Sequence, residues 1–173
     1  MATIEKSTGE GPAATGKAGK EHGVSYRDLW SRPGYLVRRL HQIHVGLFAE
    51  ECADKDLTPV QFAMLSVLYG VQGLDQFSLS TSVGVDRTSG ADVIKRLVRR
   101  GLLVRERSEL DRRANIVRIT PAGRTFVDQM RPAMERAQNR LIEPLSEGER
   151  DLFLEMIRKM VEANNSASRA PMG

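Results

Sequence analysis

Apolar residues in the segment 35–53 recur three or four positions apart, which places them on one face of an α-helix. They are Leu36, Leu40, Ile43 and Leu47. We therefore expect a first long helix over this segment.

A second helix can be predicted from the residues that would begin it. Thr58 can cap the helix, Pro59 occupies its first turn, where a missing N–H costs nothing, and Gln61 completes a capping box. The apolar run that follows should end near Gly70.

Two further helices should be separated by a tight turn. A short helix is expected over residues 76–83, with Gly84 as its stop. Asp86 can cap the next helix, which should run to Arg100 and end at Gly101.

After Gly101 apolar and polar residues alternate in the runs LLVRER and NIVRI. Alternation is typical of half-buried strands, so the two runs predict a β-hairpin with the polar SELDRRA at its tip.

Two long helices should complete the chain. Thr120 and Pro121 can begin the first of them, in which Pro132 is expected to produce a kink. Ser146 and Glu149 form a second capping box, which opens the last helix.

The order of these elements predicts a mainly α-helical protein with a small β-hairpin wing. A short helix, a turn, a longer helix and a hairpin follow one another within residues 57–119, which is the order of a winged helix-turn-helix. The helices over 33–53 and 121–163 flank this unit. We expect one domain over residues 25–163.

Both ends of the chain differ in composition from this domain. Residues 1–24 contain almost no large apolar side chain, which predicts a disordered tail, and residues 164–173 are expected to be flexible. No run approaches the roughly 18 apolar residues that a membrane span requires, and no signal-peptide core is present. We expect a cytoplasmic protein with no membrane partner.

The positive charge of the chain is concentrated in one segment. Residues 86–131 contain 12 Lys and Arg against 6 Asp and Glu, while the remainder contains 14 against 16. A basic segment of this kind is typical of a nucleic-acid surface, although a solvated basic face is the alternative.

The longer helix of the predicted helix-turn-helix leaves one set of side chains outside. They are Arg87, Thr88, Ser89, Asp92, Lys95, Arg96 and Arg99. In helix-turn-helix proteins the N-terminal end of this helix contacts base edges in the major groove, where a guanidinium can bind guanine bidentately. The adjacent basic hairpin tip favours DNA contact over a surface helix made soluble by arginine.

Other classes of protein find less support. The chain has no Gly-rich phosphate loop, no G-x-S-x-G and no Cys/His nucleophile arrangement, so we expect neither an enzyme nor a cofactor. A winged helix that binds only proteins remains an alternative, but it would favour a neutral or acidic third helix and wing.

The run VGVDRTSGADVIKRLVRRGLLVRERSELDRRANIVRITPAGR resembles the DNA-binding core of the multiple-antibiotic-resistance regulator (MarR) family. The D-x-R of that family's wing corresponds here to Asp111, Arg112 and Arg113, and the family's T-P-A-G-R follows the next strand. The resemblance extends over residues 33–163.

The resemblance implies a homodimer held together by the first helix and the last two, which binds a palindromic operator in double-stranded DNA. In this family the wing arginine enters the minor groove, which assigns that role to Arg113, with Asp111 orienting it. Arg112 would contact phosphate. A transcriptional repressor is expected, although activation is not excluded.

Members of this family typically respond to small anionic aromatic ligands bound between the dimerisation and DNA-binding regions. The residues expected to line such a site are Arg38, His41, His44, Phe48, Phe62 and Leu65. The run RPGYLVRRLHQIHVGLFAEEC resembles branches that control the breakdown of aromatic or nicotinate-like acids, so the expected effector is an aromatic or heteroaromatic acid, or its thioester.

Two alternative signals remain open. His41 and His44 could hold a metal ion, but they could also be ordinary partly buried residues, and no metal site is assigned. Cys52, the single cysteine, could sense oxidation, although the acidic residues Glu50, Glu51 and Asp54 around it disfavour the reactive thiolate.

Overall fold

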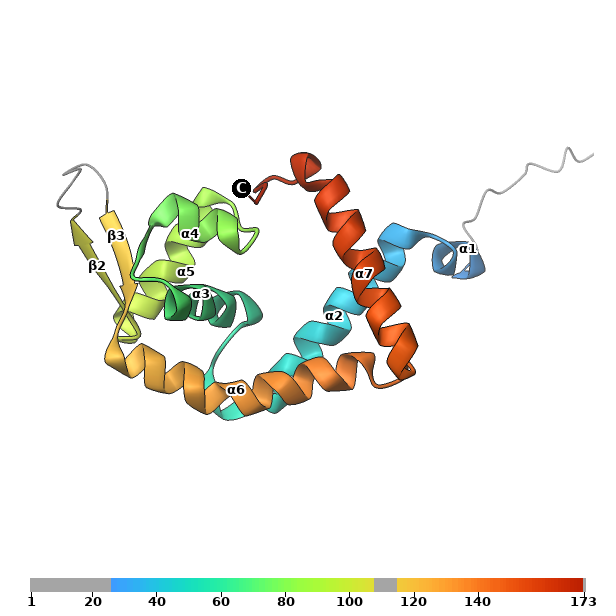
Figure 1. Ribbon diagram of the computed structural model, residues 1–173, viewed down its shortest axis with the longest axis horizontal. Coiled ribbons are helices and arrows are strands. Elements are labelled where there is room, and N and C mark those ends of the chain that lie inside the picture. The colour runs from blue at the N-terminus through green and yellow to red at the C-terminus, as the bar shows by residue number, and fades with distance from the viewer. Residues whose placement is uncertain (1–25, 108–114, 173) are drawn as a thin grey trace, which may run out of the picture. The chain divides into compact units, whose positions relative to one another are not determined.

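The computed structural model describes residues 26–107 and 115–172 of the chain (Figure 1). The helices are α1 (Tyr26–Trp30), α2 (Pro33–Glu51), α3 (Pro59–Gly70), α4 (Gln76–Ser82), α5 (Arg87–Arg99), α6 (Pro121–Ile142) and α7 (Glu147–Ala163). The strands are β1 (Leu74–Asp75), β2 (Leu103–Arg107) and β3 (Asn115–Ile119), and 3₁₀ turns are η1 (Ala53–Lys55) and η2 (Asn165–Ala167). The mainly helical fold with a small hairpin is thereby confirmed.

The chain divides into two compact units, residues 1–36 and 37–173. In the first unit, the rings of Trp30 and Tyr35 meet edge to face, with centroids 6.2 Å apart. The features described below belong to the second unit.

Side chains that cap helix N-termini begin the helices where the sequence predicted. The Gln61 N–H donates to Oγ1 of Thr58 at 3.3 Å, and the Thr58 N–H donates to Oε1 of Gln61 at 3.0 Å, which completes the capping box of α3. Asp86 caps α5 and Thr120 caps α6. Each cap satisfies N–H groups that have no partner within the helix.

The sheet has three antiparallel strands in the order β1-β3-β2. The expected hairpin pairs Leu103 with Ile119 and Arg105 with Val117. The third strand, β1, was not expected, because two residues are too few to show an alternating pattern. It pairs Leu74 with Val117 and so joins the α3–α4 connection to the hairpin.

The turn between α4 and α5 depends on two glycines. Gly84 has a φ of +68°, a conformation that side chains disfavour. Gly90 packs directly on Ser80, since a Cβ atom at position 90 would lie 2.0 Å from the Ser80 hydroxyl oxygen. The absence of a side chain at Gly90 therefore lets the two helices approach closely.

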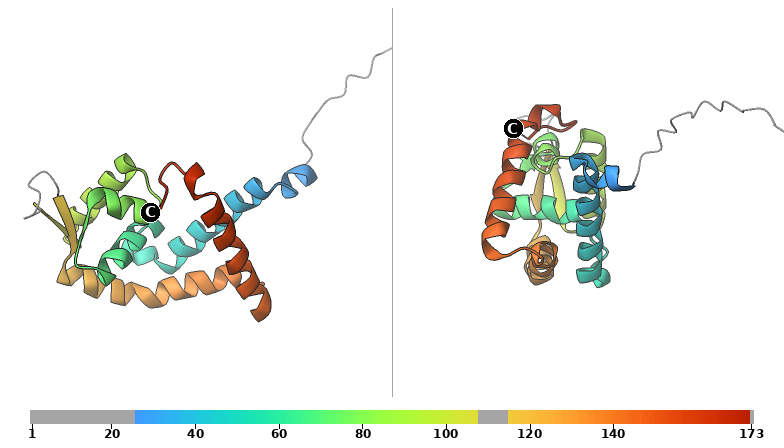
Figure 2. Two further views of the ribbon diagram at one scale, coloured as in Figure 1. Left: turned by 45° about the horizontal axis from the view of Figure 1, so that its top comes forward. Right: turned by 90° about the vertical axis from the view of Figure 1, so that its right-hand side faces the viewer.

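The hydrophobic core lies under α3, α4, α5, the sheet and the first half of α6. Its fully buried side chains include Met64, Leu65, Leu68, Leu79, Ile94, Leu97 and Val117. Figures 1 and 2 show α6 running from the sheet to α7, so one helix connects the core of the helix-turn-helix to the C-terminal helices. Pro132 lies inside α6, which is a single helix from Pro121 to Ile142.

Ion pairs join the end of α2 to α6. Nε of Arg136 lies 2.7 Å from Oε2 of Glu51, and Arg140 contacts both Glu50 and Glu51 at 2.8 and 3.0 Å. Hydrogen bonds from Arg136 and Arg140 lower the pKa of Glu51, so the carboxylate stays charged.

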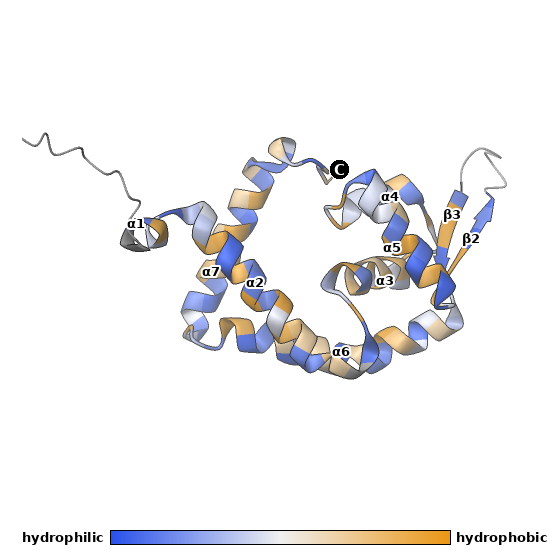
Figure 3. Ribbon diagram, turned by 180° about the vertical axis from the view of Figure 1, so that it is seen from behind, coloured by the Kyte–Doolittle hydropathy of each residue, from blue (hydrophilic) through white to orange (hydrophobic). Residues whose placement is uncertain are grey.

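Helix α7 has no buried residue, although seven of its 17 residues are Leu, Phe, Met, Ile or Val, and Figure 3 shows apolar positions along it. Its exposed apolar side chains are Leu152, Leu154, Met156, Met160 and Val161, and α2 adds Val37, Ile43 and Val45. Two helices of the second unit therefore leave apolar faces uncovered in the single chain.

The segment after α7, for which the sequence predicted a flexible tail, contains the turn η2. Asn165 and Met172 exchange two hydrogen bonds, of 2.6 and 2.9 Å, and Ala170 is buried. The amide side chain of Asn165 therefore closes this turn, and the flexibility of the tail stays a prediction.

Candidate nucleic-acid interface and small-molecule cavity

Helix α5 buries one face and exposes the other. Gly90, Ile94 and Leu97 are buried against α4 and the core. All the predicted contact residues of this helix are exposed, namely Arg87, Thr88, Ser89, Asp92, Lys95, Arg96 and Arg99. The helix can therefore present a polar, basic surface to a large partner.

The first turn of α5 is closed by its own cap. The N–H groups of Thr88 and Ser89 both donate to Oδ1 of Asp86 at 3.0 Å, and the Ser89 hydroxyl donates to Oδ2 at 2.7 Å. The hydrogen bonds from Ser89 and Thr88 lower the pKa of Asp86. The N–H groups of Thr88 and Ser89 are therefore already paired, and the exposed side chains of this face offer the further phosphate contacts.

A recess of about 410 Å³ lies beside α5 and is lined by basic side chains of two elements. Lys95 and Arg99 come from α5, and Arg105 comes from β2. Nη2 of Arg105 donates to Oε1 of Gln76 at 3.0 Å, which holds the guanidinium beside α4. Sequence reasoning missed Arg105, although its outward position on a strand next to a basic tip was a usable signal.

The predicted wing-tip residues Asp111, Arg112 and Arg113 lie outside the described residues. At the base of the wing, Arg118 pairs with Glu106 at 3.1 Å and also donates to the Gln72 carbonyl. Arg118 is therefore engaged within the protein.

A cavity of about 540 Å³ lies between α3 and α6. It is lined by Phe62, Ser66, Tyr69, Gly70, Val127, Arg131, Met134, Glu135, Gln138 and Asn139. Aromatic and aliphatic walls combined with a few polar groups are typical of a site for a small organic molecule.

Arg131 is the cation of this cavity. Its guanidinium lies 5.7 Å from the centroid of the Tyr69 ring, and Nη2 lies 3.5 Å from Oδ1 of Asp128. The ion pair with Asp128 is long and exposed, so it holds Arg131 only weakly. Arg124 contacts the same ring at 5.0 Å and donates to the Tyr69 carbonyl at 3.0 Å, which fixes Tyr69 at the cavity wall.

Of the predicted ligand residues, Phe62 lines the cavity. Phe48 and Leu65 are 1% and 0% exposed, so both belong to the core and neither lines the cavity. Arg38 and His41 are exposed on α2 and do not contribute to this cavity either.

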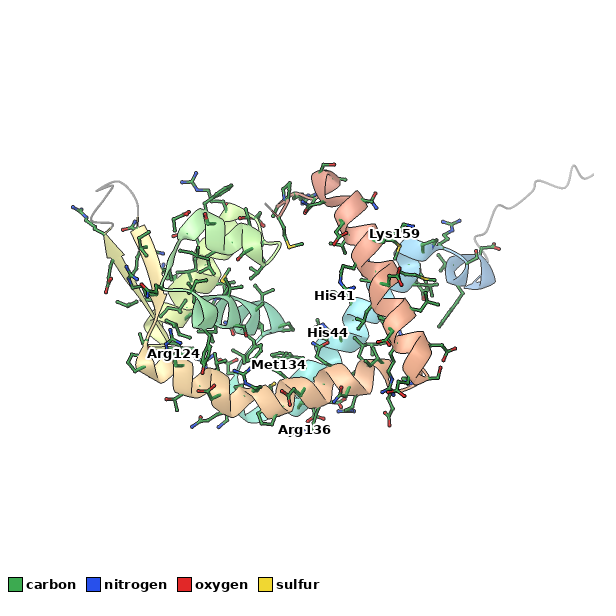
Figure 4. All side chains as sticks on the ribbon, in the orientation of Figure 1. His41, His44, Arg124, Met134, Arg136 and Lys159 are labelled. Atoms are coloured by element: carbon green, nitrogen blue, oxygen red, sulfur yellow. The ribbon has the colours of Figure 1, made fainter. Side chains whose placement is uncertain are left out.

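His44 reaches the edge of the cavity through Gln138. Figure 4 shows His41 and His44 on α2 and Met134 on α6. The amide nitrogen of Gln138 lies 3.2 Å from Nε2 of His44. Burial, followed by the nearby charge of His41, lowers the pKa of His44, so its ring is neutral at pH 7 and can accept from the amide.

The geometry gives little support to a metal ion at His41 and His44 or to oxidation of Cys52 as the signal. Within residues 26–107 and 115–172, no three His, Cys, Asp or Glu side chains come together as a metal site would require. Cys52 is 4% exposed, and burial raises the pKa of its thiol, which opposes formation of the thiolate. No helix in the described part of the chain has the length and apolar character needed to cross a membrane.

A helix-turn-helix flanked by a basic wing, with long helices on either side, defines a winged-helix DNA-binding protein. Residues 55–114 match the model of the MarR family. The chain belongs to this family of DNA-binding transcriptional regulators.

Relatives of known identity agree with this assignment. The chain is 29% identical over 140 residues to the HTH-type transcriptional repressor NicR of Pseudomonas putida, covering 81% of this chain and 89% of NicR. The PcaV regulator of Streptomyces coelicolor, solved in complex with its natural ligand, is 34% identical, with a TM-score of 0.73 and coverage of 79% of this chain and 96% of PcaV. BpsR of Bordetella bronchiseptica, whose DNA binding is regulated by 6-hydroxynicotinic acid, is 32% identical, with a TM-score of 0.72 and coverage of 75% and 93%.

Proposed function

We propose that this protein is a homodimeric repressor that binds a palindromic operator and leaves it when a small aromatic or heteroaromatic acid binds. The observation that carries the proposal is the cavity between α3 and α6, where Arg131 and two aromatic rings meet directly behind the helix-turn-helix. Two similar regulators support a ligand-responsive protein, since PcaV was solved with its natural ligand and 6-hydroxynicotinic acid regulates DNA binding by BpsR. The second of these ligands is a heteroaromatic acid.

On DNA, the division of roles follows from exposure and position. The N-terminal half of α5, with Arg87 and Thr88, enters the major groove and contacts base edges. Lys95, Arg99 and Arg105 surround the recess beside α5 and contact phosphates. Arg113 of the wing, oriented by Asp111, inserts into the minor groove, and Arg112 contacts the backbone.

In the cavity, the ligand ring packs between Phe62 and Tyr69 and its carboxylate approaches Arg131. The nearby Gln138 amide offers a further polar contact and connects the ligand to His44. A cavity of about 540 Å³ suits a single-ring acid.

Ligand binding can reach DNA because α3 and α6 form opposite walls of the cavity. Helix α3 packs under α5 in the same core, whereas α6 continues to the C-terminal helices. A ligand that changes the separation of the two walls therefore moves α5 relative to the C-terminal helices. If the ligand binds more tightly to an arrangement of α5 that does not fit the operator, fewer molecules remain in the arrangement that binds DNA.

The test combines selection with ligand titration. Duplexes that the wild-type protein retains from a random library are used for binding in the presence of benzoic, hydroxybenzoic and hydroxynicotinic acids. We expect at least one acid to weaken DNA binding and to bind the free protein. If no acid of the panel changes DNA binding, the proposed effector class is wrong.

Two substitutions place the ligand in the cavity. Arg131→Gln should weaken the effect of the acid while DNA binding without ligand stays near that of the wild type. Arg136→Gln is the matched control, because Arg136 belongs to the same helix but pairs with Glu51 outside this cavity. An equal loss of acid response in both variants would argue against the cavity.

A further inference from the structure

The side chain of Arg100 connects three parts of the chain that are distant in sequence. Arg100 follows the last residue of α5 and forms its C-cap. Its Nη1 donates to the Asp56 carbonyl at 2.6 Å and its Nη2 donates to the Lys55 carbonyl at 2.9 Å. The same guanidinium lies 5.3 Å from the centroid of the Phe126 ring on α6.

The carbonyls that Arg100 binds belong to the connection between α2 and α3. Lys55 ends the 3₁₀ turn η1, and Asp56 has φ 42° and ψ 57°. Among the described residues, Asp56 is the only one other than glycine with a positive φ. Such a conformation persists only where the surroundings fix it, and the two hydrogen bonds from Arg100 are contacts that do so.

Arginine is suited to this position by its shape. Its planar fork donates to two successive carbonyls at once, while its face remains free to lie over the Phe126 ring. The carbonyls at the end of a helical turn carry partial negative charge, which the guanidinium complements. The Arg100 bracket, meaning the contacts with Lys55, Asp56 and Phe126, therefore fixes the end of α5 to the α2–α3 connection and to α6.

We propose that Arg100 is a positioning residue for DNA binding, which sets the tilt of α5 relative to α2. This inference rests on the proposed function, since it requires a dimer that binds two half-sites. In that dimer the tilt of each α5 decides the separation of the two recognition helices. Arg100 thus determines which spacing of half-sites the protein accepts, without touching DNA itself.

Loss of the bracket should leave α5 attached but less restrained. Helix α6 still connects the helix-turn-helix core to the C-terminal helices, so the protein should remain folded. The tilt of α5 would then vary in the free protein and would have to be fixed on binding. Affinity for the preferred spacing falls, while other spacings are tolerated better in comparison.

The experiment uses a duplex that the wild-type protein selects from a random library, together with versions in which one base pair is inserted or removed between the half-sites. Arg100→Ala should weaken binding to the selected duplex by roughly tenfold. Its affinity for the altered duplexes should fall much less. The ratio of the affinity for the selected spacing to the affinity for an altered spacing therefore becomes smaller. The salt dependence should stay unchanged, because no phosphate contact is lost.

Arg99→Ala is the control, because Arg99 is the adjacent arginine and lines the basic recess. Its loss should weaken binding to all spacings alike and reduce the salt dependence. Arg100→Lys keeps a positive charge on a flexible stem but lacks the planar fork. Its ratio of affinities for the selected and altered spacings should therefore lie between those of the wild type and Arg100→Ala. This variant provides the test if Arg100→Ala fails to fold.

The inference is overturned if every folded Arg100 variant has the same ratio of affinities for the selected and altered spacings as the wild-type protein. It is also overturned if Arg100→Ala loses affinity equally at all spacings with a reduced salt dependence, since Arg100 would then contact phosphate. If the wild-type protein selects no palindromic duplex at all, the proposed function fails instead, whatever the variants do.

Discussion

At the residue scale, the packing of α4 on α5 depends on Gly90 having no side chain. A methyl group at this position would lie 2.0 Å from the hydroxyl oxygen and 2.6 Å from Cβ of Ser80, which is buried. We predict that Gly90→Ala lowers the free energy of unfolding by about 1–3 kcal/mol, as overpacking of a core does. Denaturant unfolding of the two proteins measures this difference.

The control for this substitution is Gly46→Ala in α2. No atom lies within 4 Å of a Cβ at Gly46, and alanine is the better helix former. Stability should therefore stay the same or increase. If Gly90→Ala were as stable as Gly46→Ala, the close approach of α4 and α5 would not be real.

A second prediction at this scale concerns His44 and pH. Because burial lowers the pKa of His44 in the folded protein, the neutral ring stabilises the fold at pH values above the ordinary histidine pKa. As the pH falls through that ordinary value toward the lower folded value, the unfolded state takes up the proton first and this stability is lost. Unfolding at pH 7.5 and 5.5 should therefore show a smaller pH effect for His44→Gln than for the wild type. An identical pH effect in both proteins would exclude this role of His44.

Single-residue roles were predicted unevenly from the sequence. The exposed face of α5 follows directly from helical periodicity, so all seven contact candidates lie on the surface. Phe48 was assigned to a ligand site because it shares a helix face with the histidines, and Leu65 was expected there from the second helix. Periodicity cannot distinguish a cavity wall from the core. Arg131 was missed because its partner Tyr69 is 62 positions away in sequence.

At the element scale, the beginning of α6 depends on Thr120. Its hydroxyl accepts from the Gly123 N–H at 3.0 Å and donates to the Gly101 carbonyl at 2.7 Å, which joins the helix to the turn before β2. Thr120→Ala should cost about 1–2 kcal/mol of stability, at the upper end for a helix cap. Thermal or denaturant unfolding measures this loss.

Thr125→Ala is the matched comparison within the same helix. The Thr125 hydroxyl bonds only to the Pro121 carbonyl of its own helix and is exposed, so its removal should be nearly neutral. Equal losses in both variants would mean that the cap of α6 contributes nothing particular.

Elements were predictable from sequence where a local signal marks their ends. Thr58, Asp86 and Thr120 each cap a helix at the expected residue, because capping involves only neighbours in the chain. The strand β1 and the turn η2 lacked such signals. Strand β1 exists only because β3 pairs with it, and η2 is held by Asn165 reaching Met172 seven positions away.

At the scale of the whole molecule, the exposed apolar faces of α2 and α7 require a partner, and we propose a second copy of the chain. We predict a dimer in sedimentation at micromolar concentration. Met160→Glu, which places a charge in the apolar face of α7, should produce monomers and weaken operator binding. Glu155→Lys changes charge on the same helix outside this apolar set and should remain dimeric. A wild-type monomer under these conditions would contradict the dimer.

The cavity also depends on the packing of the whole molecule, and for this reason the sequence alone did not identify its lining residues. Its walls come from α3 and α6, which are separated by the entire helix-turn-helix and the hairpin. The family resemblance indicated the region, whereas the lining residues depend on how two distant helices pack. The sequence predictions of the domain limits and of the wing contacts stay predictions.

The contact between Gly90 and Ser80 has a consequence for how such regulators acquire new operators. A recognition helix with a larger residue at position 90 fits only if position 80 becomes smaller at the same time. The two positions should therefore change together during the evolution of related proteins. A chimera that receives α5 alone from a relative with alanine at this position should lose stability as Gly90→Ala does, whereas transfer of α4 and α5 together should carry the operator preference without that loss.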